Sequence, residues 1–175
     1  VSINSSGGLG SGANGAGVSI FASYFAASFD GLEVSNSTGP GVHALSGGAI
    51  QGSEWNLHDN GEQGFWLDSA ATIVDGLVLT GNGDDGVHIN DARYVYLSNL
   101  SSSGNLDAGM SFYKANDIET TSDVSCLHCT TTGDGRGIVV SDSVDLWLTD
   151  IEVHDPIAGP AIFVDNSGLD VGGQG

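Results

Sequence analysis

The chain has 175 residues and carries 22 acidic side chains against three lysines and arginines, which gives a formal net charge of −19 at pH 7. Nucleic acid is bound mainly through lysine and arginine, so this composition excludes nucleic acid as a partner and disfavours other polyanions. No stretch approaches the ~20 consecutive apolar residues that cross a bilayer as a helix, so we expect no membrane span.

A three-segment pattern recurs along the chain every 22 to 28 residues. Its clearest cue is a glycine, or once a proline and alanine, before an apolar alternation: Gly17-Val18, Gly41-Val42, Gly64-Phe65, Gly86-Val87, Gly109-Met110, Gly137-Ile138 and Pro160-Ala161-Ile162. Short segments precede the cue: Leu32–Val34, Trp55–Leu57, Leu77–Leu79, Leu100–Ser102, Val124–Cys126 and Ile151–Val153. Further segments follow it and begin at Ile50, Ile73, Val95, Ile118, Leu146 and Leu169. All are short, alternating and rich in β-branched residues, as strands are.

Self-similarity at this period is typical of a solenoid, in which each coil buries its apolar face only by stacking on its neighbours. We therefore predict an all-β fold: a right-handed single-stranded parallel β-helix of about seven coils, each with three short strands stacked about 4.8 Å from the next coil. One solenoid domain is expected over residues 1–175, either as a protomer or as a segment of a longer assembly.

The turn before the second strand repeats an asparagine. Asn60, Asn82 and Asn105 each stand five residues before the apolar position, which predicts an internal asparagine ladder because stacked amides bond from coil to coil. Two inward columns are expected from the same frame. They are Val18, Val42, Phe65, Val87, Met110, Ile138 and Ile162, and Ile20, Ala44, Leu67, Ile89, Phe112, Val140 and Val164.

On these glycine, asparagine and apolar repeats the chain resembles the right-handed parallel β-helix superfamily, the pectate-lyase-like group with parallel β-helix repeats. The resemblance spans nearly the whole chain and implies the fold. That superfamily contains polysaccharide lyases, galacturonases, sugar epimerases, phage tailspikes, adhesins and inert surface proteins, so the fold leaves the function open.

The string Asn82-Gly-Asp-Asp-Gly-Val-His88 resembles the paired-aspartate motif of β-helical galacturonases, whose carboxylates act as general acid and base. On that resemblance the candidate catalytic residues are Asp84, Asp85, His88 and Asp107. The Gly-His-Gly, Arg-x-Lys and Asn-Thr-Asp motifs of those enzymes are lacking at matching places. A solvated acidic edge is the alternative interpretation.

Lyases of the superfamily use calcium held by carboxylates together with an arginine or lysine base. Four acids in successive versions of one turn are the calcium candidates: Asp84, Asp85, Asp107 and Asp134. The base is lacking, since neither Arg93 nor Lys114 falls in their outward column and Arg136 is expected to stand alone in a long loop. No other cofactor is expected.

That long loop is expected between residues 124 and 138, because the fifth coil is the longest of the set. It contains Cys126 and Cys129, which predict a local disulfide in an oxidising compartment. Two free thiols remain an alternative, and so does a metal site that adds His128 and His154.

An outward column of aromatic and histidine side chains is the candidate binding or assembly surface, because exposed rings on a flat sheet stack on sugars or pack against protein. Its members are His43, Trp66, His88, Tyr113 and Phe163. Three sequons at Asn4, Asn36 and Asn99 are glycosylation candidates and favour an extracellular or cell-surface location.

The favoured function is an extracellular structural or adhesive solenoid that associates with itself head to tail into a filament. Residues 1–3 fit a first strand and residues 169–171 a third, and neither end carries an amphipathic helix as a lid. The alternatives are a polysaccharide-active enzyme, as lyase, epimerase or glycoside hydrolase, and a non-catalytic sugar-binding module. Catalysis is less favoured because only one coil has a long loop to build a cleft.

Overall fold

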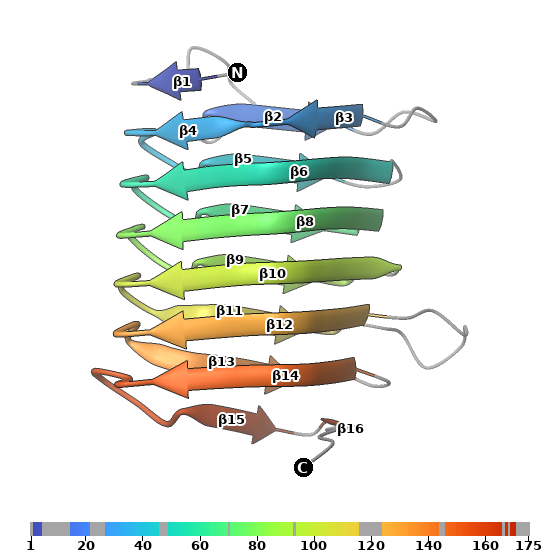
Figure 1. Cartoon of the computed structure of the whole chain (residues 1–175), viewed down its shortest axis with the longest axis vertical. Coiled ribbons are helices and arrows are strands. Elements are labelled where there is room, and N and C mark those ends of the chain that lie inside the picture. Colours follow the sequence, from blue (N-terminus) through green and yellow to red (C-terminus); the bar gives the residue numbers. More distant parts are fainter. Residues whose placement is uncertain are drawn as a thin grey trace.

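The computed structural model describes most of the chain, as residues 2–4, 15–21, 27–45, 49–69, 71–92, 94–115, 124–143, 146–165, 167 and 169–170. These residues form two parallel sheets that run the length of a rod (Figure 1). The nine-stranded sheet contains β1 (Ser2–Asn4), β3 (Ala27–Asp30), β4 (Glu33–Ser35), β6 (Ala49–His58), β8 (Ala71–Thr80), β10 (Val95–Ser103), β12 (Val124–Thr132), β14 (Leu146–His154) and β16 (Leu169–Asp170). The seven-stranded sheet contains β2 (Val18–Phe21), β5 (Val42–Leu45), β7 (Phe65–Asp68), β9 (Val87–Asn90), β11 (Ala108–Tyr113), β13 (Arg136–Ser141) and β15 (Ile162–Asp165). No helix in this described part of the chain is long and apolar enough to cross a membrane.

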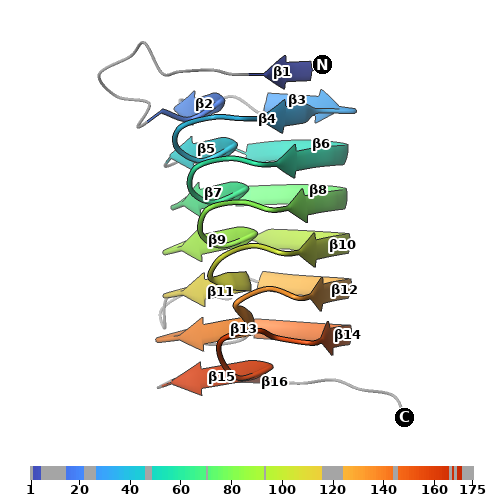
Figure 2. The ribbon, with the colours of Figure 1, turned by 90° about the vertical axis from the view of Figure 1, so that its left-hand side faces the viewer.

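The predicted β-solenoid is confirmed, since every strand pairs in parallel with its counterpart one coil away. Two details differ from the prediction. Six turns separate the seven strands of the second sheet, against about seven coils expected. The three short strands per coil also become two, because the third strand of one coil continues into the first strand of the next (Figure 2).

A single residue with positive φ bends each of these long strands, so the hydrogen-bonded sheet continues around the corner. These corner residues stack in one column, Glu54, Gly76, Asn99, His128 and Asp150, and Gly31 occupies the same corner between β3 and β4. A corner of one residue is too short to break the pairing on either side, and this is why the expected boundary between two strands is lost.

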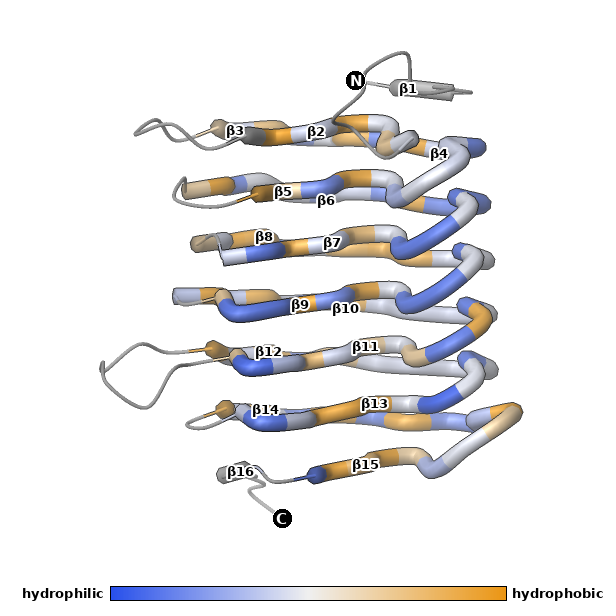
Figure 3. The backbone as a smooth tube through the Cα atoms, turned by 180° about the vertical axis from the view of Figure 1, so that it is seen from behind, coloured by the Kyte–Doolittle hydropathy of each residue, from blue (hydrophilic) through white to orange (hydrophobic). Residues whose placement is uncertain are grey.

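Both inward columns of the seven-stranded sheet are confirmed by the strand register. Val42 pairs with Phe65, which pairs with Val87, and the column continues through Met110 and Ile138. All five side chains are fully buried. Figure 3 shows the resulting alternation of hydrophobic and hydrophilic positions along the strands. The apolar core therefore lies between the two sheets along the rod axis.

The asparagine ladder closes the core at the turn between the sheets. The Nδ2 atom of Asn60 donates to Oδ1 of Asn82 (3.0 Å), Asn82 donates to Asn105 (2.8 Å), and Asn105 donates to Oδ1 of Asp134 (2.8 Å). Asp134 is therefore the last rung of the ladder and is buried. Its prediction as an outward calcium ligand is wrong, because it occupies the inward asparagine position of its coil.

The glycine of each repeat cue lies where this ladder passes beneath the backbone. A Cβ atom on Gly86 would stand 2.6 Å from the carbonyl oxygen of Gly109 and 2.5 Å from Oγ of Ser102. The same clash recurs at Gly64, whose Cβ would meet the carbonyl oxygen of Gly86 at 2.9 Å. Close stacking of the turns, rather than backbone freedom, therefore requires glycine at this position.

The additional residues of the fifth coil do not lie where the sequence predicts. Val87 pairs with Met110, and Val95 pairs with Val124. Val95 follows Val87 by 8 residues, whereas Val124 follows Met110 by 14 residues. The excess therefore precedes Val124. Residues 124–126 belong to the third segment of their coil and not to the first, while Ile118 lies outside the described residues.

Candidate functional site

The turns that lead into the seven-stranded sheet carry a column of charged side chains two residues beyond the ladder. Its members are Glu62, Asp84, Asp107 and Arg136, following Asn60, Asn82, Asn105 and Asp134 in turn. These turns form the hydrophilic corner that Figure 3 shows beside β7, β9, β11 and β13. A bend of two residues carries the backbone from the closed core towards the surface, so this column is where these turns present charge.

Three of the predicted acidic residues lie together in this corner. Asp84, Asp85 and Asp107 each offer one carboxylate oxygen, and these oxygens lie within 4.8 Å of one another. Inverting glycosidases keep their two carboxyl groups about 6.5–9.5 Å apart to admit a water molecule. The cluster is too close for that arrangement.

Asp85 is held in place on both of its oxygens. Oδ1 accepts from the backbone N–H of Ala108 at 2.8 Å, and Oδ2 lies 2.9 Å from Nδ1 of His88. The carboxylate is buried, whereas the histidine is only half-buried. Asp85 therefore fixes the turn of the next coil and orients the ring of His88.

Arg136 does not stand alone, and that prediction is wrong. Its Nε donates to Oδ1 of Asp107 at 2.7 Å, and Nη2 contacts Oδ2, so the guanidinium binds the carboxylate through two parallel hydrogen bonds. The Asp107 carboxylate raises the pKa of Arg136. Arg136 is therefore a permanent cation in the acidic corner and cannot act as a base there.

Asp84 is the acid best suited to proton transfer. Burial raises its pKa, and the neighbouring carboxylates of Asp85 and Asp107 raise it further. Its Oδ2 accepts from Nε2 of Gln63 at 2.5 Å. A raised carboxyl pKa keeps the proton available closer to neutral pH, as a general acid requires.

A shallow, open groove lies beside Asp84 on the surface of the second sheet. It is lined by Gly61, Glu62, Gln63, Trp66, Gly83 and Asp84. Trp66 contributes an aromatic ring to the lining and packs edge-on against His88, with 6.2 Å between the ring centroids. The groove thus combines one aromatic ring with carboxylate and amide groups, the combination that binds a sugar.

The predicted outward column is only partly exposed. His43 is 2% exposed, and its ring stacks on Trp66 with centroids 4.1 Å apart. Burial lowers the pKa of His43, and the Asp68 carboxylate partly opposes this. His43 therefore supports Trp66 from the coil above and is not a surface contact, because packing between outward rings buries it. Tyr113 and Phe163 remain exposed but lie away from the groove lining.

The corner was also predicted to hold calcium, an ion that takes six to eight oxygen ligands. The carboxylates are already occupied by donors: Arg136 on Asp107, Gln63 on Asp84, and His88 with a backbone N–H on Asp85. Asp134 faces the core. Calcium at Asp84, Asp85 and Asp107 therefore stays a prediction, since an ion there would have to displace these donors, and we derive no chemistry through a metal.

Cys126 and Cys129 are joined by a disulfide. They lie on either side of the corner residue His128 in β12, and both are fully buried. The bridge therefore spans a bend inside the core and does not pin a protruding loop. The metal alternative is not met in this arrangement, because His128 is exposed and faces Asp150 at 3.4 Å.

The sequons occupy different settings. Asn36 and Asn99 are exposed, and both adopt positive φ at corners of the coil. The amide of Asn99 donates to Asp75 at 2.7 Å. Asn4 lies in β1, and its side chain lies outside the described residues, as does Arg93.

Sequence reasoning missed the Arg136–Asp107 pair and the contact of Gln63 with Asp84. The missing signal was the ladder itself. If Asp134 is aligned with Asn105, Arg136 falls two residues later, as Asp107 does after Asn105. This alignment was not recognised because an aspartate, Asp134, stands where the other coils have asparagine.

Comparison with known proteins agrees with this geometry. Residues 16–173 match the model of a family described as "right handed beta helix region", which also gives the coil its right hand. No curated protein and no solved structure matches the chain.

Proposed function

The chain belongs to the right-handed β-helix family. We propose that it is a structural or adhesive solenoid of the cell exterior, and that its copies stack head to tail. The proposal is carried by the unbroken register of the core columns from β2 to β15. Nearly equivalent coils make a rod that resists bending and extends by repetition.

The last strand of the second sheet supports this role. Ile162 and Val164 are 46% and 42% exposed, whereas Ile138 and Val140, one coil earlier in the same columns, are fully buried. A further coil laid on β15 would bury them, whether it came from a second copy or from more of the same chain. Head-to-tail contacts between copies generate open filaments.

An exterior location is supported by the Cys126–Cys129 disulfide. Disulfides persist in oxidising compartments and are rare in the reducing cytosol. The acidic surface would keep such rods soluble, and added salt would screen their mutual repulsion. Association between copies is therefore expected to increase with ionic strength.

Sedimentation velocity over a range of concentrations and salt tests the stacking of copies. We expect the sedimentation coefficient to increase with both. The double variant Ile162→Asp, Val164→Asp is expected to stay monomeric because it places charge in the core columns. The control Val78→Asp, Leu127→Asp adds the same charge at positions 43% and 41% exposed on the other sheet. A wild-type chain that stays monomeric at high salt would contradict association between copies.

Acid catalysis on a polysaccharide is the second candidate, favoured by the raised pKa of Asp84 beside the Trp66 groove. Elimination is disfavoured, since Arg136 is bound by Asp107 and cannot take a proton. Hydrolysis, with Asp84 as the proton donor, is the remaining possibility.

Assays of reducing ends on neutral glycans and polygalacturonate check this candidate. Any activity should be lost in Asp84→Asn and retained in Asp91→Asn, an exposed aspartate on the next corner of the same coil. Inactivity on the whole panel removes hydrolysis and leaves the structural proposal standing.

A further inference from the structure

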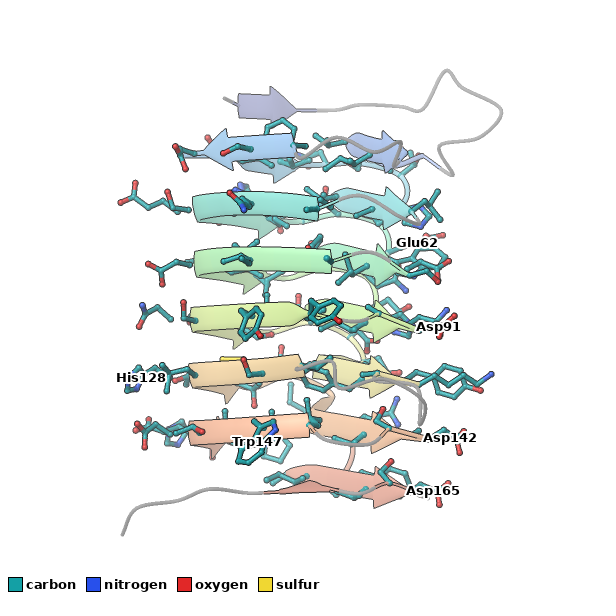
Figure 4. The ribbon with its side chains drawn as sticks, turned by 90° about the vertical axis from the view of Figure 1, so that its right-hand side faces the viewer. Glu62, Asp91, His128, Asp142, Trp147 and Asp165 are labelled. Atoms are coloured by element: carbon teal, nitrogen blue, oxygen red, sulfur yellow. A yellow bond between two sulfur atoms is a disulfide. The ribbon has the colours of Figure 1, made fainter. Side chains whose placement is uncertain are left out.

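The outer face of the nine-stranded sheet carries exposed aromatic rings that the sequence did not reveal. Tyr94, Tyr96 and Trp147 are 50%, 40% and 48% exposed, and Ile73 beside them is 50% exposed. We name these four residues the aromatic platform. Figure 4 looks onto this face, on which Trp147 is labelled. A cluster of large exposed apolar side chains on a parallel sheet marks an interaction surface.

The platform is ordered by the register of the sheet. Ile73 pairs with Tyr96, Tyr96 with Ser125, and Ser125 with Trp147. Three platform residues, Ile73, Tyr96 and Trp147, therefore stand with Ser125 in one outward column along the rod axis, and Tyr94 lies beside it. With about 4.8 Å between coils, the rings of Tyr96 and Trp147 are anchored about 10 Å apart. The small Ser125 lies between them in the column and offers a hydroxyl group.

We propose that this platform binds an uncharged, extended polysaccharide that runs parallel to the rod axis. Sugar rings present apolar faces that stack on tyrosine and tryptophan, while their hydroxyls bond to polar side chains between the rings. Repeating sugar faces suit rings that recur at a fixed interval along a column. This inference stands on a different face from the stacking surface at β15 and does not depend on it.

Charge selects the ligand. From Gln51 through Ile73, Tyr96 and Ser125 to Trp147 the column carries no charged residue, in a chain whose net charge is −19, and the next position in the register is Asp170. A polyanion would be repelled by the surrounding acids, and so would the same face of a second copy. A neutral glycan carries no charge and is therefore not repelled by these acids.

Affinity electrophoresis provides the test. Native gels containing a neutral β-glucan, xylan or mannan, or polygalacturonate as the anionic probe, are run with wild type and variants. We expect at least one neutral glycan to retard the wild type, with retardation insensitive to added salt and none by polygalacturonate. Tyr96→Ala, Trp147→Ala should weaken binding about tenfold or more, since two stacking contacts are lost.

The control is Tyr113→Ala, Phe163→Ala, which removes two comparably exposed rings from the opposite sheet and should bind like the wild type. Thermal unfolding of each variant establishes that it is folded. The proposal is overturned if no neutral glycan retards the wild type, or if the platform variant and the wild type bind equally. It is also overturned if the platform variant loses self-association instead, which would identify a second copy as the occupant. The Ile162→Asp, Val164→Asp variant should still bind glycan, so failure of stacking and failure of this proposal are distinguishable.

Discussion

Two columns that lie two residues apart in four successive coils behave in opposite ways. The ladder column repeats one residue type through Asn60, Asn82 and Asn105 and is buried, whereas the neighbouring charged column changes from Glu62 to Arg136 and faces solvent. Asn60 and Asn82 each donate to an asparagine in the next coil, and Asn105 donates to Asp134. In the charged column, by contrast, each contact depends on which two side chains happen to be adjacent.

The difference shows where a repeat protein fixes stability and where it is free to acquire function. A buried amide must have its partner in the next coil, so its identity is constrained along the whole rod. A surface position two residues later has no such constraint. The coil of Asp134 departs from the others in both columns. It has a carboxyl group in the ladder and, two residues later, the cation Arg136 in the charged column.

Breaking the ladder should have the largest effect. In Asn82→Ala the backbone N–H of Asn60 loses its acceptor inside the core, and Nδ2 of Asn60 keeps only the carbonyl oxygen of Val34 at 3.4 Å. We expect a loss of about 3 kcal/mol in the free energy of unfolding, measured by urea denaturation, because buried unpaired donors keep their desolvation cost. Asn56→Ala, at an exposed position of β6, should change it by less than about 0.5 kcal/mol. Equal losses in the two variants would show that the ladder contributes no more than a surface amide.

Completing the ladder should have a smaller effect of opposite sign. Burial raises the pKa of Asp134. The folded carboxyl therefore holds its proton more tightly than the unfolded one, so its stabilising contribution is full below the ordinary value of 3.8 and is lost as the pH rises through the folded pKa. In Asp134→Asn the new amide can donate to Oγ1 of Thr131, as Asn105 donates to Oγ of Ser102.

We expect Asp134→Asn to gain about 1 kcal/mol at neutral pH and to lose this part of the pH dependence. Urea denaturation at several pH values between 3 and 8 measures both, with Asp134→Ala as the control that should destabilise because Asn105 loses its acceptor. If Asp134→Asn were less stable than the wild type at neutral pH, this would contradict a penalty for the buried carboxyl.

Changing the charged column should alter chemistry more than stability. Asp107→Asn removes one of the carboxylates that raise the pKa of Asp84, so that pKa should decrease towards its ordinary value. Carboxyl NMR titration measures it, and Asp91→Asn should leave it unchanged. Because the side chains of Arg136 and Asp107 are 36% and 43% exposed, losing their ion pair should change stability by only about 1 kcal/mol or less. An unchanged pKa of Asp84 would show that the cluster is not electrostatically coupled.

Much of the fold was predictable because it is periodic. The inward columns and the asparagine ladder follow from alternation and a fixed coil length, and both are present in the structure. Two of the departures from the predicted coil, the fused strands and the misplaced excess in the fifth coil, share one origin. A corner of one left-handed residue leaves no distinct signal in sequence, since Glu54, His128 and Asp150 fill it as readily as Gly76.

The site was less predictable. Asp84, Asp85, His88 and Asp107 were identified from one motif and do lie together, but their partners Gln63 and Arg136 come from the coils above and below. The exposed rings were assigned to one sheet, whereas stacking buries His43 there and leaves Tyr96 and Trp147 exposed on the other.

The amino-acid sequence by itself determined the period, the inward positions and the buried amides of this protein, because these depend only on alternation along the strand and repetition between coils. The tertiary structure alone decided which side chains of different coils touch and which outward rings stay exposed. Those contacts depend on the register at the corners and on the size of the neighbour one coil away, and neither is encoded within a single repeat.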